Sequence, residues 1–495
     1  MNNESTITQG DSVLKKTVGI ILFLVVFSLN ALAEEHSFNC YSIVAGKNTT
    51  VDGSVLFGHN EDNARKFVSG MWRVDGVDYT SDAFVKLENG TRIPQVARTS
   101  SFLWLQMPER EYSDGLVNEY GVAIVTDNCP SREDNPELTS GGIGGPVLRR
   151  LVIERAKTAR EGVEILGQLI DSYGYTASGR TMIICDGNEG WLVAMVNGKH
   201  WVAQRVPDDE VAMIANTYTI TTVDLSDTEN FLGSADIINY AVKRGWYDPK
   251  DGPFSFEAAY ADPDVRMMPG NTHRHWSGLR HVVKGSLPLP EDERPPFSVT
   301  PKKKLDVNDI AAVLRDHYEG ASYETTEMIS HKRHTTTICQ PGTNSSSIFQ
   351  LRADMPVEIG TVWWLAMWQP CSTPYMPVYL GSLTVPPELG FDPQSDGTCP
   401  FCVVSPEFGH AYRVFSDFSA FADKEYVSQM DNVRDMWSGY ERSSSNMQTV
   451  LEESALKLWE SDRAGALELI TRYSHGAVSR AVRMAEMHLL EQQSE

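Results

Sequence analysis

The sequence predicts an α+β protein in which β-hairpins stack sheet on sheet and helices cover them. Residues 41–45 and 54–57 are rich in β-branched and aromatic side chains, and the turn-forming run 46–53 between them predicts a hairpin. A glycine-rich loop then leads into a helix predicted over 147–173 by its apolar periodicity. Further strand pairs follow, and the pattern from residue 411 onward is mainly helical. This order of hairpin, helix and hairpins fits a sheet-on-sheet core under helices.

The remaining strands are predicted by apolar runs that end in turn residues. We expect them near 102–107, 121–125, 181–186, 190–195, 201–209, 211–216, 343–352 and 360–368. A short helix is expected over 307–314, and the last helix is expected to run from residue 477 to about 490. The 495 residues allow two or three domains or one large one, and the sequence has no internal repeat.

The chain is strongly acidic, with a formal charge of −23 and a pI near 5.0. This charge argues against binding to nucleic acid or to anionic lipid. Seven cysteines is an odd, low number for an exported chain. Apart from Cys40, six remain and could be paired or free: residues 129, 185, 339, 371, 399 and 402. For Cys399 and Cys402, a local disulfide or two free thiols is expected rather than a redox motif.

The N-terminus carries the features of an export signal. Lys15 and Lys16 precede an apolar run over 18–29, and the small residues of 31–33 form an A-x-A cleavage site. The run is short for a membrane span, so an uncleaved anchor is the weaker interpretation. We therefore predict a signal peptide over 1–33 and export to the periplasm or the medium, with no membrane association after cleavage.

Cleavage there would leave a short pro-segment, 34–39, ahead of Cys40. A second cut between Asn39 and Cys40 would expose the α-amine of the cysteine, whose unperturbed pKa is near ~8 and which can act as general base to its own thiol. The predicted hairpin would also bring Cys40 beside the polar run 59–62, which contains His59 and Asp62. The alternative is that Cys40 simply begins the first strand, since a lone cysteine is more often a small buried hydrophobe.

Two further residues are candidates for the same site. Asn216 ends an apolar strand, where its amide NH2 could donate to the oxyanion of a tetrahedral intermediate; a turn residue is the alternative. The run 273–281 contains three histidines but no Cys, Asp or Glu at ligand spacing, so we predict no metal there. Instead we expect a buried arginine that orients the nucleophile or a carboxylate. Arg274 is the first choice and Arg280 the second.

Several motifs resemble the cysteine dipeptidases of peptidase family C69, a group of N-terminal-nucleophile hydrolases. These dipeptidases are related to secernins and, distantly, to penicillin V acylases and bile salt hydrolases. The chain has C-x-x-x-x-x-G-K from Cys40, D-G-S at 52–54, N-E-D at 60–62 and L-R-D-H-Y-E-G at 314–320. The resemblance covers nearly all of the chain after residue 39, and no single motif carries it.

The resemblance implies a four-layer αββα sandwich with a helical C-terminal region. It implies a catalytic domain over 40–390, with the loop and helices of 391–495 packed on it. It also implies hydrolysis of unblocked dipeptides through a thioester, without metal or organic cofactor, and leaves a homo-oligomer open. The roles it carries over are Cys40 as nucleophile, Asn216 as oxyanion donor, Asp62 beside the α-amine and Arg274 as the family's arginine. His59 is a departure, because acylase relatives have an arginine there.

Two alternatives remain open from the sequence. An amidohydrolase acting on N-acyl compounds would share the nucleophile and differ only in its pocket. A non-enzymatic, secernin-like protein would not need Cys40. The order of signal peptide, short pro-segment and cysteine favours an enzyme that is processed.

Overall fold

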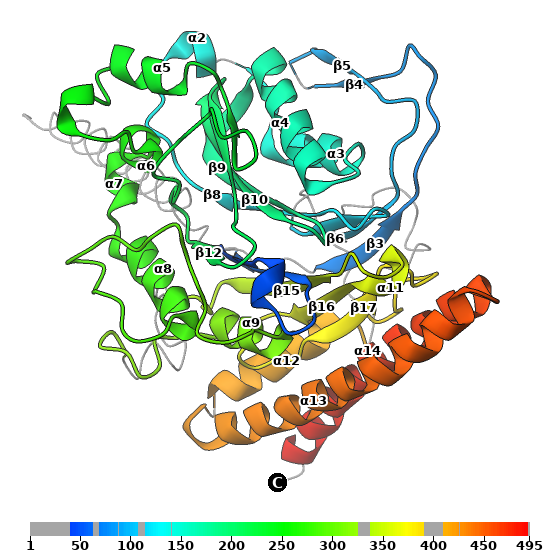
Figure 1. The fold of residues 1–495 in the computed structure, drawn as a ribbon. Coiled ribbons are helices and arrows are strands. Elements are labelled where there is room, and N and C mark those ends of the chain that lie inside the picture. Colours follow the sequence, from blue (N-terminus) through cyan, green and yellow to red (C-terminus); the bar gives the residue numbers. More distant parts are fainter. Residues whose placement is uncertain are drawn as a thin grey trace, which may run out of the picture.

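The computed structural model describes residues 40–62, 69–87, 89–106, 114–139, 141–324, 337–390, 409–424 and 426–493. The predicted signal peptide and pro-segment, and the pair Cys399 and Cys402, lie outside these ranges. Figure 1 shows two sheets stacked face to face, with helices above the upper sheet and below the lower one. The architecture is the expected four-layer αββα sandwich.

The lower sheet has seven strands and the upper sheet has eight, and every pair of neighbouring strands is antiparallel. The lower sheet has the order β14 (Ser298–Val299), β12 (Val211–Ile214), β1 (Tyr41–Ala45), β2 (Val55–Asp62), β15 (Thr343–Leu351), β16 (Thr361–Met367), β17 (Met376–Tyr379). The upper sheet has the order β13 (Phe231–Gly233), β11 (Trp201–Arg205), β10 (Gly190–Gly198), β9 (Tyr175–Cys185), β8 (Ala123–Asn128), β7 (Leu116–Asn118), β6 (Phe102–Gln106), β3 (Gly70–Val74). The first predicted hairpin is therefore the β1–β2 pair near the middle of the lower sheet.

Helices cover the outer face of each sheet. The upper sheet is covered by α3 (Gly145–Ile153) and α4 (Ala159–Tyr173). The lower sheet is covered by α8 (Pro269–Val282), α9 (Val307–Leu314), α12 (Ala411–Lys424), α13 (Tyr426–Trp459) and α14 (Arg463–Gln493). None of the helices in the described part of the chain combines the length and apolar character that crossing a bilayer requires.

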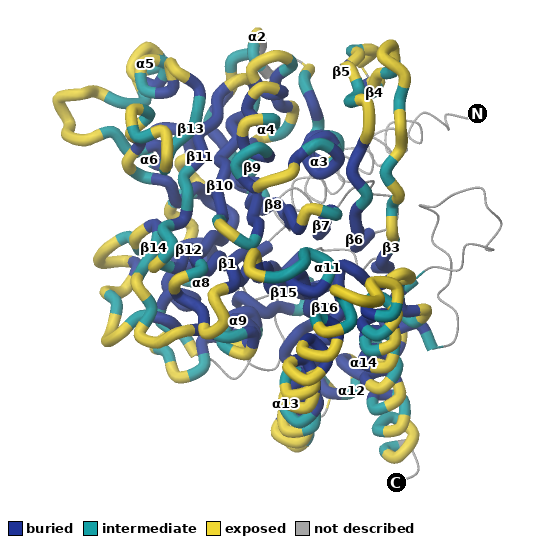
Figure 2. The backbone as a smooth tube through the Cα atoms, turned by 45° about the vertical axis from the view of Figure 1, so that its right-hand side comes forward, coloured by how far each residue is buried: buried dark blue, intermediate teal, exposed yellow. Residues whose placement is uncertain are grey.

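The alternation of side chains along β1 decides where Cys40 lies. Ile43 belongs to the apolar cluster between the lower sheet and its helices, whereas Val44 belongs to the cluster between the two sheets. Successive side chains of a strand point to opposite faces, so Ser42 and Cys40 lie on the same face as Val44. Both faces of β1 are covered, and Figure 2 shows this strand deep within the buried part of the molecule. Cys40 therefore enters the layer between the sheets.

The predicted helix over 147–173 is wrong in one respect, because the structure has two helices there. The first, α3, ends at Ile153, and the second, α4, begins after Thr158, whose side chain accepts a hydrogen bond from the backbone N–H of Glu161. Asn118 donates from Nδ2 to the carbonyl oxygens of Ile153 and Ala156, at 3.0 and 2.7 Å. The break is stable because side chains satisfy the exposed backbone groups on both sides of it.

The C-terminal helices also differ from the prediction. The structure has one continuous helix, α14, from Arg463 to Gln493, where a last helix was predicted only from residue 477. Buried Ile470, Val478 and Val482 lie on both sides of the expected boundary, so packing against the sheet and the neighbouring helices continues through it.

Candidate active site

Cys40 stands immediately before β1 and is 3% exposed. Its Sγ lies 4.0 Å from the backbone carbonyl oxygen of Asp62, at the end of the neighbouring strand β2. Burial raises the pKa of the Cys40 thiol well above its ordinary value, and the charges of Glu61, Asp127 and Asp62 raise it further. The thiol is therefore neutral at rest, and forming the thiolate requires a base or a cation close by.

Arg274 connects Cys40 to Asn216. It projects from α8, is fully buried, and donates from Nη1 to the backbone carbonyl oxygen of Cys40 at 3.0 Å. Its Nη2 donates to Oδ1 of Asn216 at 2.9 Å and to Oδ1 of Asn271 at 3.1 Å. Arg280, the second choice from the sequence, instead pairs with Asp316 at 2.7 Å. The arginine beside Cys40 is thus Arg274.

Asn216 follows β12 in a left-handed backbone conformation, with φ of +49°. Asparagine adopts this conformation more readily than most residues, although it still costs roughly 1–3 kcal/mol. Its Nδ2 donates to the backbone carbonyl oxygen of Asn128, at the end of β8 in the opposite sheet, at 2.9 Å. The residue therefore bridges the two sheets beside Cys40, with its amide oriented by partners on both sides.

Asp62 ends β2 and is completely buried. Thr343 donates to its Oδ1 at 2.6 Å, and Gln340 donates to its Oδ2 at 2.5 Å. Burial raises the pKa of Asp62 to about 7, although both hydrogen bonds and the charge of Arg274 oppose this rise. Close to neutral pH this carboxyl can therefore either hold or release a proton.

His59 lies in a chain of hydrogen bonds that crosses the site. Ser42 donates to Oδ2 of Asp127 at 2.6 Å, so its oxygen accepts from Nδ1–H of His59 at 2.8 Å. The other ring nitrogen, Nε2, faces Oε2 of Glu61 at 3.3 Å. Burial disfavours the charged ring, but the hydrogen bond to Glu61 and the charges of Asp127 and Glu61 outweigh it and raise the pKa of His59. The geometry favours an imidazolium held between two carboxylates.

Cys40, His59 and Glu61 have the residue types of a metal site, and one potential ligand atom from each lies within 4.8 Å of the others. The hydrogen bonding does not favour a metal there. Both nitrogens of the His59 ring face oxygen acceptors, and the protonated ring has no lone pair to offer. In this arrangement the ring supplies positive charge beside the thiol.

A second group of charged residues adjoins the site from the upper sheet. Arg149 of α3 is buried and donates to the backbone oxygen of Asp114 at 3.1 Å, while Ser345 donates to Oδ2 of Asp114 at 2.5 Å. Within the described ranges, Nε of Arg149 and Oδ1 of Asp114 have no hydrogen-bond partner. Ser345 pairs with Glu61 where β15 lies beside β2, so this group lies next to the polar end of β2. Buried unpartnered groups of both signs are suited to a charged ligand.

The structure brings together all five residues predicted for the site: Cys40, His59, Asp62, Asn216 and Arg274. The sequence reasoning missed Ser42, Glu61, Asp114, Asp127, Arg149, Gln340 and Thr343. Of these, Ser42 and Glu61 carried a signal, because alternation along β1 and β2 places them on known faces. The others reach the site from distant segments.

Known proteins are similar to this chain over more than two thirds of its length. The model of peptidase family C69 matches residues 39–438. A protein of Latilactobacillus sakei named "Probable dipeptidase" is 28% identical over 352 residues, which are 69% of this chain and 74% of that protein. "Probable dipeptidase B" of Streptococcus pyogenes serotype M1 is 26% identical, covering 75% of this chain and 76% of its own. "Dipeptidase A" of Lactobacillus helveticus is 22% identical, covering 80% and 87%. With most of its length matched by the family model, the chain belongs to peptidase family C69.

Proposed function

We propose that the protein is a cysteine dipeptidase that hydrolyses unblocked dipeptides, with Cys40 as an N-terminal nucleophile exposed by cleavage after Asn39. The main support is geometric: the buried Cys40 adjoins Asp62 and is connected through Arg274 to Asn216. The chain's membership of a peptidase family agrees with this proposal. The curated relatives named above are dipeptidases by name.

In the proposed reaction the α-amine of Cys40 takes the proton of its own thiol, and the sulfur attacks the carbonyl carbon of the substrate. The carbonyl electrons move to the oxygen, and Nδ2 of Asn216 would donate to that oxyanion. Collapse of the intermediate forms a thioester and expels the second amino acid, which takes the proton back from the ammonium group. Water then attacks the thioester, releases the first amino acid and regenerates the thiol.

The surrounding charges support a substrate with free ends. A dipeptide has an α-ammonium and an α-carboxylate, and the site offers the acidic side chains of Glu61 and Asp114, where burial raises the pKa of Asp114 to about 7, as well as the guanidinium of Arg149. An acyl chain in the same place would bury apolar groups against charges without pairing them, which costs free energy. This observation favours a dipeptide over the N-acyl compounds of an amidohydrolase. The leader sequence supports action in the periplasm or the medium.

The first experiment is the N-terminal mass of the purified protein, for the wild type, for Cys40→Ala and for the control Cys185→Ala, which changes a buried cysteine of β9. Self-cleavage predicts that wild type and control begin at Cys40, whereas Cys40→Ala keeps residues 34–39. Wild-type protein that begins at Glu34 would refute the mechanism, because its α-amine would remain blocked.

The second experiment compares hydrolysis of a free dipeptide with that of its N-acetyl and C-amide derivatives. The proposal predicts that either block lowers kcat/KM strongly, because each removes one charge that the site would pair. Preference for the N-acetyl compound would support the amidohydrolase instead.

A further inference from the structure

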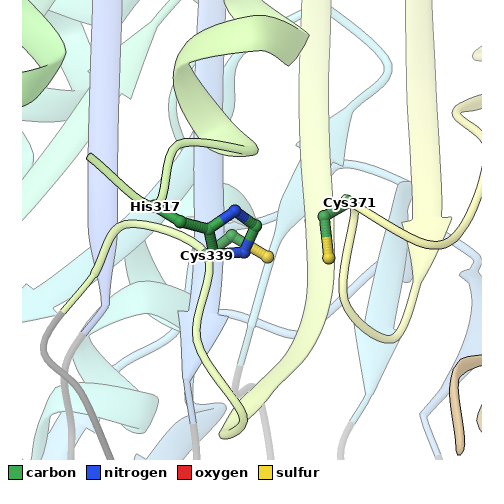
Figure 3. Close-up of side chains that lie close together, drawn as sticks. All are labelled: His317, Cys339 and Cys371. Carbon is green, nitrogen blue, oxygen red and sulfur yellow. The ribbon is translucent and has the colours of Figure 1, made fainter. Parts of the chain in front are cut away.

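A cluster of three buried side chains lies apart from the residues of the proposed reaction. His317 follows α9, Cys339 precedes β15, and Cys371 lies in the turn after β16. One nitrogen of His317 and the two sulfur atoms all lie within 4.8 Å of one another. Figure 3 shows the imidazole and the two thiols pointing toward a common space from three separate segments.

A carboxylate orients the histidine of this cluster. Oε1 of Glu319 lies 2.9 Å from Nδ1 of His317, so Nε2 is the ring nitrogen that faces the two cysteines. Glu319 is in turn 3.5 Å from the guanidinium of Arg434 on α13. Histidines that bind metals almost always donate their other ring N–H to a carboxylate or carbonyl, which fixes the tautomer and strengthens the ligand. This contact is independent of the convergence of the three side chains.

We propose that His317, Cys339 and Cys371 bind a zinc ion. Two thiolates and one neutral imidazole are ligands that Zn²⁺ prefers, and the two negative charges would balance the ion in a buried place. Tetrahedral zinc holds its sulfur and nitrogen ligands about 3.5–3.8 Å apart, so the present arrangement needs only a small closure. Glu319, the carboxylate that contacts His317, forms an ion pair with Arg434 at 3.5 Å, so the zinc ion does not have to balance its charge.

Zinc usually has four ligands, and a cavity beside the cluster could supply the fourth as a water molecule. A cavity of about 650 Å³ lies between α9 and α13, and both Cys371 and Glu319 line it. A water molecule from this cavity could complete a tetrahedral site. The ion would then bind three protein ligands and one solvent molecule.

The position of Cys339 gives the ion a structural role. The next residue, Gln340, donates to Asp62 at 2.5 Å, and Thr343 donates to the same carboxylate. A zinc ion would tie the segment that carries Gln340 to the end of α9 and to the turn after β16. It would thereby hold the partners of Asp62 in place without contacting the substrate.

The test is the zinc content of the full-length protein, purified with reductant and without chelator. We expect about one zinc per chain for wild type and for two controls, Cys185→Ser and Cys40→Ala, and little for Cys339→Ser and Cys371→Ser. The controls separate this cluster from other buried thiols, including the nucleophile. Glu319→Gln should weaken zinc affinity roughly 10–100-fold, because it removes the charged partner of His317.

A measurement on the wild type keeps the test decisive if the serine variants fail to fold. Zinc-free protein titrated with Co²⁺ should develop a thiolate-to-cobalt charge-transfer band, and bound Co²⁺ should protect Cys339 and Cys371 from alkylation as mapped by mass spectrometry. Wild-type protein that binds neither metal under reducing conditions would overturn the proposal. So would a disulfide between Cys339 and Cys371 that is present in the active protein, since it removes both thiolates.

Discussion

Arg274 donates a hydrogen bond from Nη2 to Oδ1 of Asn216 at 2.9 Å. Arginine has only donors, so its partner atom must be the amide oxygen, and the contact settles which way the amide of Asn216 faces. The NH2 group then donates one hydrogen to the carbonyl oxygen of Asn128. Its second hydrogen is the one that an oxyanion at Cys40 would use.

Replacing Asn216 by Asp tests this assignment, because the change keeps the shape and the oxygen that Arg274 contacts but removes the NH2 donor. If Asn216 donates to the oxyanion, kcat for dipeptide hydrolysis should fall about 10²–10³-fold, with a much smaller change in KM. Steady-state kinetics measure both constants. A variant that keeps wild-type kcat would show that Asn216 only accepts from Arg274.

Asp62 gives a pH dependence of stability that can be measured in Cys40→Ala, the variant expected to keep the peptide bond before residue 40. Burial raises the pKa of Asp62 to about 7, against about 3.9 in an unfolded chain. Between these values the folded chain holds a proton that the unfolded chain has lost, so the free energy of unfolding falls as pH rises, by up to about 4 kcal/mol. Urea denaturation across this range measures it.

The matched comparison adds Asp62→Asn to the same background. An amide cannot ionise, so this part of the pH dependence should disappear, whereas Asp435→Asn on the exposed face of α13 should leave it unchanged. An unaltered slope in the Asp62→Asn variant would mean that other buried acids cause it. In processed wild type, the new ammonium group beside Asp62 should lower its pKa and reduce the slope.

His59 also predicts that the free energy of unfolding falls as pH rises, but here the group that loses its proton is a positively charged ring. Its pKa is raised, because its hydrogen bond to Glu61 and the charges of Asp127 and Glu61 outweigh the effect of burial. A raised histidine pKa contributes stability that is full below the unfolded value and is lost as pH rises through the folded value. His59→Gln should therefore cost about 3–5 kcal/mol near about pH 5.5 and clearly less near about pH 9.

Urea denaturation of both proteins at the two pH values gives this difference. His475→Gln, which changes a partly exposed histidine of α14, serves as the control and should show no such pH dependence. An equal loss at both pH values for His59→Gln would indicate that the ring is neutral and acts only through packing.

The C-terminal helices are joined to the lower sheet by a buried ion pair. Arg352, just after β15, donates to both carboxylate oxygens of Glu452 on α13, at 2.7 and 2.6 Å. Glu452→Gln should lower the free energy of unfolding by about 3–5 kcal/mol, because the guanidinium remains buried without its charge partner. Glu468→Gln removes an exposed pair with Arg472 and should cost about 1 kcal/mol or less. Similar losses in the two variants would mean that this buried ion pair contributes little to holding α13 on the sheet.

Local signals in the sequence were enough to predict the fold around Cys40. Residues 41–45 and 54–57, rich in β-branched and aromatic side chains, and the turn-forming run between them predicted the β1–β2 hairpin, and the short helix predicted over 307–314 is α9. The family resemblance and the four-layer architecture are confirmed. The chemical roles of Cys40 and Asn216 stay predictions, as does the signal peptide.

The rest of the site depends on contacts that no local pattern records. Gln340 and Thr343 reach Asp62 from 278 and 281 residues away, since β15 pairs with β2 only in the folded sheet. The break between α3 and α4 depends on Asn118, which lies at the end of β7 and is distant in sequence from both helices. The three proposed zinc ligands are likewise far apart in sequence. Glu319, which contacts His317 but is not a ligand, lies two residues after it.

The position of β1 between β12 and β2 has a consequence for the rigidity of the nucleophile. Chain termini usually fray, because they lack neighbours on at least one side. A terminus created at Cys40 would instead emerge from the interior of a sheet, with a partner strand on each side and covered faces above and below. Amide protons of Tyr41–Ala45 should then exchange with solvent only through opening of the whole sheet. The reacting end of the chain would be among its slowest-exchanging parts.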